Sequence, residues 1–199
     1  MKFAKVTLVL LLVFALGIGA FAWSGIYNPG ADSPHWKITY ALIEASRDRS
    51  VERHASTVVV PANLDDPQLI LNGAGHYAAM CSDCHLAPGK QDSELRAGLY
   101  PLPPNLSETN VDPVDSREAF WIIKHGLKMS AMPAWGMSHD DVTIWSMVAF
   151  LRKLPGMAPE QYQEMIAKAL PDVDLDSMGG ETMPASHGHT HVGYTHASD

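Results

Sequence analysis

The two cysteines of the chain stand in one pentapeptide, Cys81-Ser82-Asp83-Cys84-His85, with the pattern C-x-x-C-H. This pattern is typical of a covalent attachment site for haem. On one turn of helix Cys81 and Cys84 share a face, so both sulfurs can form thioethers with the vinyl groups on one porphyrin edge. The imidazole of His85 follows directly and can take one axial position on the iron. The motif therefore predicts one covalently bound haem c.

Such a cysteine pair has three other common uses: a redox-active dithiol, half of a zinc site, or a disulfide. A redox dithiol is expected near a βαβ pattern and does not require the adjacent histidine. A zinc site of this kind needs a second pair of ligands, and the chain has no further cysteine to supply it. The local pattern and the cysteine count together favour haem attachment.

Length, composition and charge limit the other function classes. The chain has 199 residues, 46% of them hydrophobic, and a formal net charge of −8. It is long enough for one modest core, so we expect a single domain with extensions. The acidic balance argues against a nucleic-acid partner. No glycine-rich phosphate loop is present, which argues against a nucleotide site.

Residues 1–27 are expected to be a membrane anchor or a signal segment. Residues 6–26 carry no charge and are long enough to span a bilayer as a helix. Ala20-Phe21-Ala22 resembles a cleavage site, whereas Trp23 and Tyr27 match the aromatic belt of a retained anchor. We favour a single-pass anchor in the cytoplasmic membrane with the haem domain on the periplasmic side. The alternative is a soluble periplasmic protein after cleavage.

Residues 28–66 are expected to be a helical spacer. Ser33 and Pro34 suit the start of a helix that would run to about Arg53, with an apolar first half and a mixed-charge, solvated second half. Such a helix would pack near the membrane or on the haem domain. We interpret His35 and His54 as surface or capping histidines rather than additional haem ligands.

Residues 67–157 are expected to form the haem domain. Asp66 and Pro67 predict the start of a helix that runs into the haem motif. A loop rich in proline and glycine then extends to Leu106 and would wrap the edge of a flat cofactor.

The second half of this domain predicts two further helices. Ser116 would cap a helix over residues 117–124, and the capping box at residues 138–141 would open another to about Leu154. The loop between them, Met-Ser-Ala-Met-Pro-Ala-Trp-Gly, contains two thioether side chains.

These motifs together resemble the class I cytochrome c family over residues 67–157. They are G-x-x-x-Y before the haem motif, Pro-Pro-Asn-Leu after it, a Met-Pro-Ala-Trp-Gly loop and a closing amphipathic helix, in the family's order. The resemblance implies an all-α fold whose first and last helices cross near Gly73 and Tyr77, where Phe150 would meet them.

The resemblance also implies the ligand set of the haem iron. His85 and Met132 would be the two axial ligands, and the carbonyl of Pro104 would accept the Nδ1 proton of His85. Met129 is the competing thioether, but Met132 precedes a proline that fixes the backbone, as in the family.

A carrier with both axial positions filled has no site for a substrate, so the iron can only gain or lose one electron. We therefore expect an electron carrier and not an enzyme, working alone or as a subunit of an oxidoreductase complex in a respiratory or related redox chain. Its partners would be a dehydrogenase or quinol-oxidising complex upstream and a terminal oxidase or soluble carrier downstream. The alternatives are a haem enzyme or sensor with a labile methionine ligand, and a metal-handling protein.

Residues 158–199 are expected to be a short helix followed by a disordered, His-rich tail. A flexible chain can fold several imidazoles around Cu(II), Ni(II) or Zn(II). The tail histidines are therefore a candidate metal site: His187, His189, His191 and His196.

Overall fold

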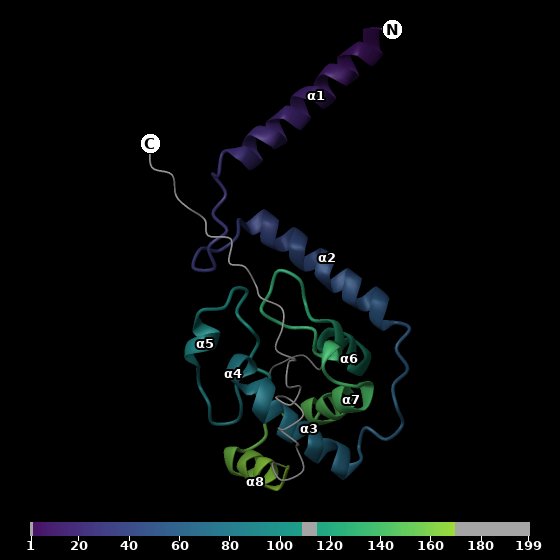
Figure 1. The fold of residues 1–199 in the computed structure, drawn as a ribbon, viewed down its shortest axis with the longest axis vertical. Coiled ribbons are helices and arrows are strands. Elements are labelled where there is room, and N and C mark those ends of the chain that lie inside the picture. Colours follow the sequence, from purple (N-terminus) through teal and green to yellow (C-terminus); the bar gives the residue numbers. More distant parts are fainter. Residues whose placement is uncertain (1, 109–114, 170–199) are drawn as a thin grey trace, which may run out of the picture.

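The computed structural model describes residues 2–108 and 115–169 of the chain. Throughout these residues the regular elements are helices, as the sequence predicted (Figure 1). They are α1 (Lys2–Trp23), α2 (Lys37–Ala55), α3 (Pro67–Met80), α4 (Ser82–His85), α5 (Glu94–Ala97), α6 (Ser116–His125), the 3₁₀ turn η1 (Trp135–Met137), α7 (Asp141–Leu151) and α8 (Pro159–Ala169).

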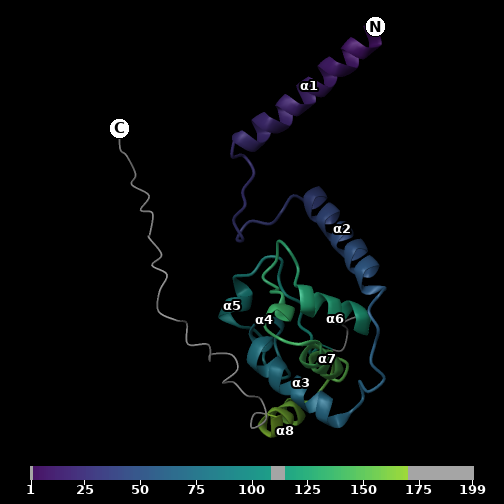
Figure 2. The same cartoon turned by 45° about the vertical axis from the view of Figure 1, so that its right-hand side comes forward.

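Helix α1 projects away from the other helices (Figure 1 and Figure 2). Its most apolar stretch has a mean hydropathy of 2.5, and none of it is buried. Its length and composition are those of a membrane span, and a signal sequence at this place in the chain passes the same test.

The haem domain is organised around the crossing of α3 and α7. Asp66 caps α3 by accepting a hydrogen bond from the backbone N–H of Gln68, as its sequence predicts. At the crossing, a Cβ added to Gly73 would lie 1.9 Å from the carbonyl oxygen of Ser146, so only glycine fits there. Next to it the rings of Tyr77 and Phe150 lie 5.3 Å apart. The predicted crossing is therefore confirmed.

The caps of α6 and α7 differ from the sequence prediction. Asp115, not Ser116, accepts a hydrogen bond from the first turn of α6, and Asp140, not Ser138, accepts the one from the N–H of Thr143 in α7. In both cases the aspartate stands at the residue directly before the helix, so its carboxylate reaches the free N–H groups. The serine predictions were wrong by one or two positions.

Helix α2 lies along the haem domain and contacts α6 (Figure 2). It begins at Lys37 rather than Pro34, and no side chain caps it. Its second half is not fully solvated, because Val51 and Ala55 are buried. The other faces of this half carry exposed Arg and Glu side chains, so its sequence does not reveal that one face is buried.

Two apolar cores pack on either side of α7. One joins α3, α7 and α8 through Ala74, Tyr77, Phe150, Leu154 and Tyr162. The other joins α6 and α7 through Phe120, Ile123, Ile144, Met147 and Val148. Helix α8 contributes Tyr162 to the first core. The packed unit therefore extends beyond residue 157, the predicted end of the haem domain.

Candidate functional site

The C-x-x-C-H segment lies where α3 gives way to the short helix α4. The N–H of Cys81 donates to the carbonyl of Tyr77 at 2.9 Å, which closes the last turn of α3. The N–H groups of Cys84 and His85 then donate to the carbonyl of Cys81 at 3.1 and 2.8 Å. The two sulfurs and the imidazole are thus presented by one continuous helical turn.

The thiol of Cys81 does not have the properties of a redox-active thiol. Both cysteines are free and partly buried. Burial raises the pKa of the Cys81 thiol to about 12, with a smaller contribution from Cys84. A redox dithiol needs a lowered pKa, because the thiolate is the nucleophile. In the part of the chain that the structure describes, no group of three or more His, Cys, Asp and Glu side chains is placed to hold a metal ion.

The ring of His85 is oriented by a carbonyl group on the loop after the motif. Its Nδ1 lies 3.0 Å from the carbonyl oxygen of Pro104, and because a carbonyl can only accept, Nδ1 carries the proton. Nε2 therefore keeps its lone pair. Burial lowers the pKa of His85, the hydrogen bond to Pro104 acts in the opposite direction, and the charge of Arg96 lowers it further. The neutral imidazole, which is the form that binds iron, is favoured.

The loop that carries Pro104 is held by Arg96, which the sequence analysis did not single out. The Nε of Arg96 donates to the carbonyl of Pro103 at 3.1 Å, and only 15% of its side chain is exposed. Ser93 caps the short helix that contains this arginine by accepting from its N–H. An isolated arginine in a proline-rich loop has no sequence pattern that reveals this role.

Tyr77 fixes the backbone around the histidine. Its buried hydroxyl donates to the carbonyl of Leu86 at 2.6 Å, with the carbonyl of His85 3.3 Å away. The N–H of Leu106 also donates to the carbonyl of His85, at 3.1 Å. The sequence predicted the ring of Tyr77 as contact area but not its hydroxyl as a hydrogen-bond donor.

Met132 lies on a loop pinned to the end of α6. The N–H of Leu127 donates to the carbonyl of Met132 at 3.2 Å, and the N–H of Met132 donates to the hydroxyl of Ser130 at 3.2 Å. Gly126 adopts a φ of +65°, and a Cβ there would lie 2.7 Å from the carbonyl oxygen of Met132. Met132 packs against the core of α6 and α7, whereas Met129 is 70% exposed.

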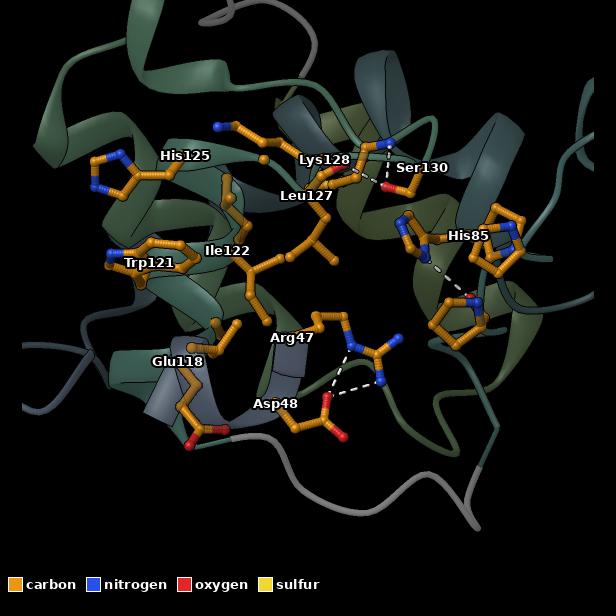
Figure 3. Close-up of a pocket in the computed structure, with 18 of the residues that line it drawn as sticks. Arg47, Asp48, His85, Glu118, Trp121, Ile122, His125, Leu127, Lys128 and Ser130 are labelled. Atoms are coloured by element: carbon orange, nitrogen blue, oxygen red, sulfur yellow. Dashed lines mark hydrogen bonds and ion pairs between the residues drawn. The ribbon is translucent and has the colours of Figure 1, made fainter. Parts of the chain in front are cut away.

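One large cavity, about 1770 Å³, brings the predicted site residues together (Figure 3). It exceeds the roughly 300–1,000 Å³ of ordinary ligand pockets. Its lining includes the five predicted site residues Cys81, Cys84, His85, Pro104 and Met132, and also Met129, the competing thioether. The cavity combines two thiols, the imidazole of His85 and the thioethers of Met80, Met129 and Met132 with mostly apolar walls. This donor set fits a haem held by two thioether bonds and two axial ligands.

His35 and His54, the other histidines considered from sequence, each contact an aromatic side chain, and His54 also lines the cavity. The ring of His35 is hydrogen-bonded to the hydroxyl of Tyr27, and the backbone N–H of His35 donates to the hydroxyl of Tyr100 at 3.0 Å. His54 is exposed and stacks on Trp121 with ring centroids 5.5 Å apart. The tail histidines, residues 187–196, lie outside the described residues.

The all-helical fold and the family match of residues 68–151 show a class I monohaem c-type cytochrome domain, which supports a haem-based electron-transfer role. Within the chain, residues 68–151 match the model of the family described as cytochrome C oxidase, cbb3-type, subunit III. The match includes the C-x-x-C-H motif and the Met-Pro loop. No curated protein and no solved structure matches the chain.

Proposed function

We propose that the protein is a monohaem, membrane-anchored c-type cytochrome that transfers single electrons in a respiratory or related redox chain. Cys81 and Cys84 hold the haem covalently, and His85 and Met132 are its axial ligands. When bound, the haem iron supplies one-electron oxidation and reduction. One haem is proposed because the chain has only 2 cysteines.

The observation that carries this proposal is the convergence on one cavity of side chains from distant parts of the chain. Cys81, Cys84 and His85 enter it from the end of α3, and Met132 enters from the loop after α6. Each of the two segments is held by its own backbone hydrogen bonds. An imidazole and a thioether in fixed positions at one cavity are what a six-coordinate carrier requires.

The chain's residues determine how the carrier behaves. The carbonyl of Pro104 fixes the tautomer of His85 and increases the basicity of its free nitrogen. A neutral, soft thioether from Met132 favours Fe(II) over Fe(III), which raises the reduction potential relative to a second histidine. With both positions filled, a small molecule has no place to bind, so an electron carrier is favoured over a haem enzyme.

The proposed location is the periplasmic side of the cytoplasmic membrane, with α1 as a retained anchor. Trp23, at the outer end of α1, is 94% exposed, as suits an aromatic residue at the membrane interface. The upstream partner would be a dehydrogenase or quinol-oxidising complex, and the downstream partner a terminal oxidase or soluble carrier. The oxidase-subunit family of residues 68–151 supports a partner of this respiratory kind.

The test is the intact mass and absorption spectrum of the full chain, matured in a host that attaches haem to C-x-x-C-H proteins. We expect the mass of the uncleaved chain plus one haem, in the membrane fraction. Cys81→Ser and Cys84→Ser should each prevent stable holoprotein, whereas Ser82→Ala, between them, should mature normally.

Three outcomes would contradict the proposal or a part of it. Normal haem content in the double cysteine variant would remove the covalent attachment. Rapid binding of carbon monoxide by the reduced protein would show an open or labile axial position and favour a haem enzyme or sensor. A mass that lacks residues 1–22 would instead show cleavage after Ala22 and a soluble periplasmic carrier.

A further inference from the structure

Helix α2 contributes a stripe of residues to the cavity, and the middle of that stripe is a charge. The residues of α2 at every fourth position turn towards the haem domain: Ile43, Arg47, Val51 and Ala55. The first three line the cavity, and the fourth is buried. A contact stripe of this spacing normally consists of apolar residues. The charged guanidinium of Arg47 in this stripe therefore suggests an anionic partner on the cavity side of α2.

Among the arginine and lysine side chains that line this cavity, Arg47 is the one in the middle of the contact stripe of α2. Its side chain is 37% exposed, whereas that of Arg49 is 84% exposed. Lys128 is exposed, and Arg152 pairs with Asp65 at 3.5 Å. Figure 3 shows Arg47 and His85 among the side chains around the cavity.

The present partners of Arg47 leave part of its guanidinium free to bind another anion. Its Nε and one terminal nitrogen both lie 2.7 Å from Asp48, and that terminal nitrogen is also 3.4 Å from Glu44, which leaves the other terminal nitrogen for a further partner. These contacts, with the bond to Asp48 as the main cause, raise the pKa of Arg47, so it stays charged. A guanidinium has five N–H donors in a planar fork, so it can keep Asp48 and accept a second carboxylate.

The cofactor of the proposed site brings carboxylates into this cavity. A haem carries two propionate groups, which are ionised at neutral pH. An ionised carboxylate that leaves water needs a charged, hydrogen-bonding partner. Arginine suits this role best, because its fork binds both oxygens of one carboxylate.

We propose that Arg47 binds a haem propionate and that α2 is therefore part of the haem site, an inference that rests on the proposed haem-carrier function. Helix α2 lies outside residues 68–151, the segment that belongs to the cytochrome family. The helix between the anchor and the domain is thus a wall of the cofactor site as well as a spacer. Its packing against α6, where His54 stacks on Trp121, holds Arg47 over the cavity.

The test compares Arg47→Gln with Arg49→Gln, a matched control that removes the same charge from a more exposed side chain of the same helix. Reduction of the iron adds one negative charge, so a nearby cation favours the reduced state. We expect Arg47→Gln to lower the reduction potential of the holoprotein by more than Arg49→Gln does. The difference should persist at high ionic strength, because salt screens partly buried charges less than exposed ones.

A second variant, Arg47→Lys, keeps the positive charge but removes the guanidinium, which can donate two parallel hydrogen bonds to one carboxylate. We expect it to shift the carboxylate stretching bands in the infrared difference spectrum between the reduced and oxidised holoproteins, with a smaller change in reduction potential than in Arg47→Gln. If Arg47→Gln does not mature, this variant carries the test. Unchanged carboxylate bands in Arg47→Lys, or equal potentials in Arg47→Gln and Arg49→Gln, overturn the proposal.

These outcomes are separate from a failure of the haem-carrier function. All three variants keep Cys81, Cys84, His85 and Met132, so each should contain one covalent haem with a six-coordinate spectrum if that function is right. Absence of haem from the unmodified chain would contradict the carrier function itself. A normal spectrum with no effect of Arg47 would contradict only the propionate contact.

Discussion

The Nδ1 of His85 lies 3.0 Å from the carbonyl oxygen of Pro104, and these two residues approach the site from opposite ends of one long loop. A proline carbonyl is a stable acceptor, because the ring fixes φ and the residue has no N–H of its own. The position of this oxygen depends on the rest of the loop. Arg96 holds it by donating to the carbonyl of the preceding residue, Pro103, at 3.1 Å.

We expect Arg96→Lys to raise the reduction potential of the holoprotein. Lysine keeps the positive charge but loses the Nε donor, so the loop loosens and the hydrogen bond from His85 to Pro104 weakens. A weaker bond lowers the basicity of the ligating nitrogen and stabilises Fe(III) less. Redox titration measures the change, with the exposed Arg117→Lys as control. A potential that is equally unaffected in both variants would show that Arg96 does not position the loop.

A second prediction concerns the hydroxyl of Tyr77. This residue is 1% exposed, and its hydroxyl donates to the carbonyl of Leu86 at 2.6 Å. Tyr77→Phe leaves this buried carbonyl without its donor. Such a loss costs about 1–3 kcal/mol in the free energy of unfolding. Urea denaturation of the holoprotein measures it.

The matched control is Tyr162→Phe. Tyr162 packs its ring against Phe150 at 6.2 Å, and its hydroxyl has no hydrogen bond within the described part of the chain. We expect this variant to unfold at nearly the same urea concentration as the unmodified protein. Equal losses in the two variants would mean that the hydroxyl of Tyr77 contributes nothing beyond its ring.

The sequence predicted those parts of the fold whose causes are local. Asp66 followed by Pro67 marks a helix start within two residues, and the structure has α3 begin there. The crossing of α3 and α7 was also predictable, since Gly73 is the residue that a close backbone approach requires. The placement of cysteines and histidine on one turn follows from the spacing of the motif alone.

The contact of α2 was harder to predict, because its cause is not local. Arg47, one of the four residues of its contact stripe, is charged, and the apolar periodicity of the helix is too weak to reveal which face is buried. Its partners, such as Trp121 for His54, lie far away in the sequence. Arg47 therefore looked like one charge in a solvated run, although its side chain lines the cavity.

A third prediction distinguishes the two methionines of the loop. Met132→Ala should remove the sixth ligand, give a high-spin spectrum or recruit another ligand, and lower the reduction potential. Met129→Ala should leave all three unchanged, because Met129 is 70% exposed. The weak far-red absorption of the oxidised protein reports a bond from methionine to iron. Its loss in Met129→Ala, with Met132→Ala unaffected, would reverse the assignment.

The last prediction concerns the dependence of stability on pH. His76 on α3 is partly buried, and its ring lies 5.8 Å from that of His139, with Asp140 nearby. Burial is the main cause that lowers the pKa of His76, the charge of His139 lowers it further, and Asp140 acts in the opposite direction. The folded protein therefore binds this proton less readily than the unfolded chain, where the pKa of histidine is about 6.5.

Above a pH of about 6.5, His76 is neutral in both states, so its titration does not affect the free energy of unfolding. As the pH drops from about 6.5 towards the lower pKa of the folded state, the unfolded chain binds the proton first and the free energy of unfolding falls. Urea denaturation of the holoprotein at about pH 7.5 and about pH 5.5 measures this loss. We expect His76→Gln to reduce the loss, because glutamine does not titrate. His139→Gln should reduce it by a smaller amount, since it removes the lesser cause and leaves the burial of His76 intact. An identical loss in the unmodified protein and His76→Gln would show that other groups carry the pH dependence in this range.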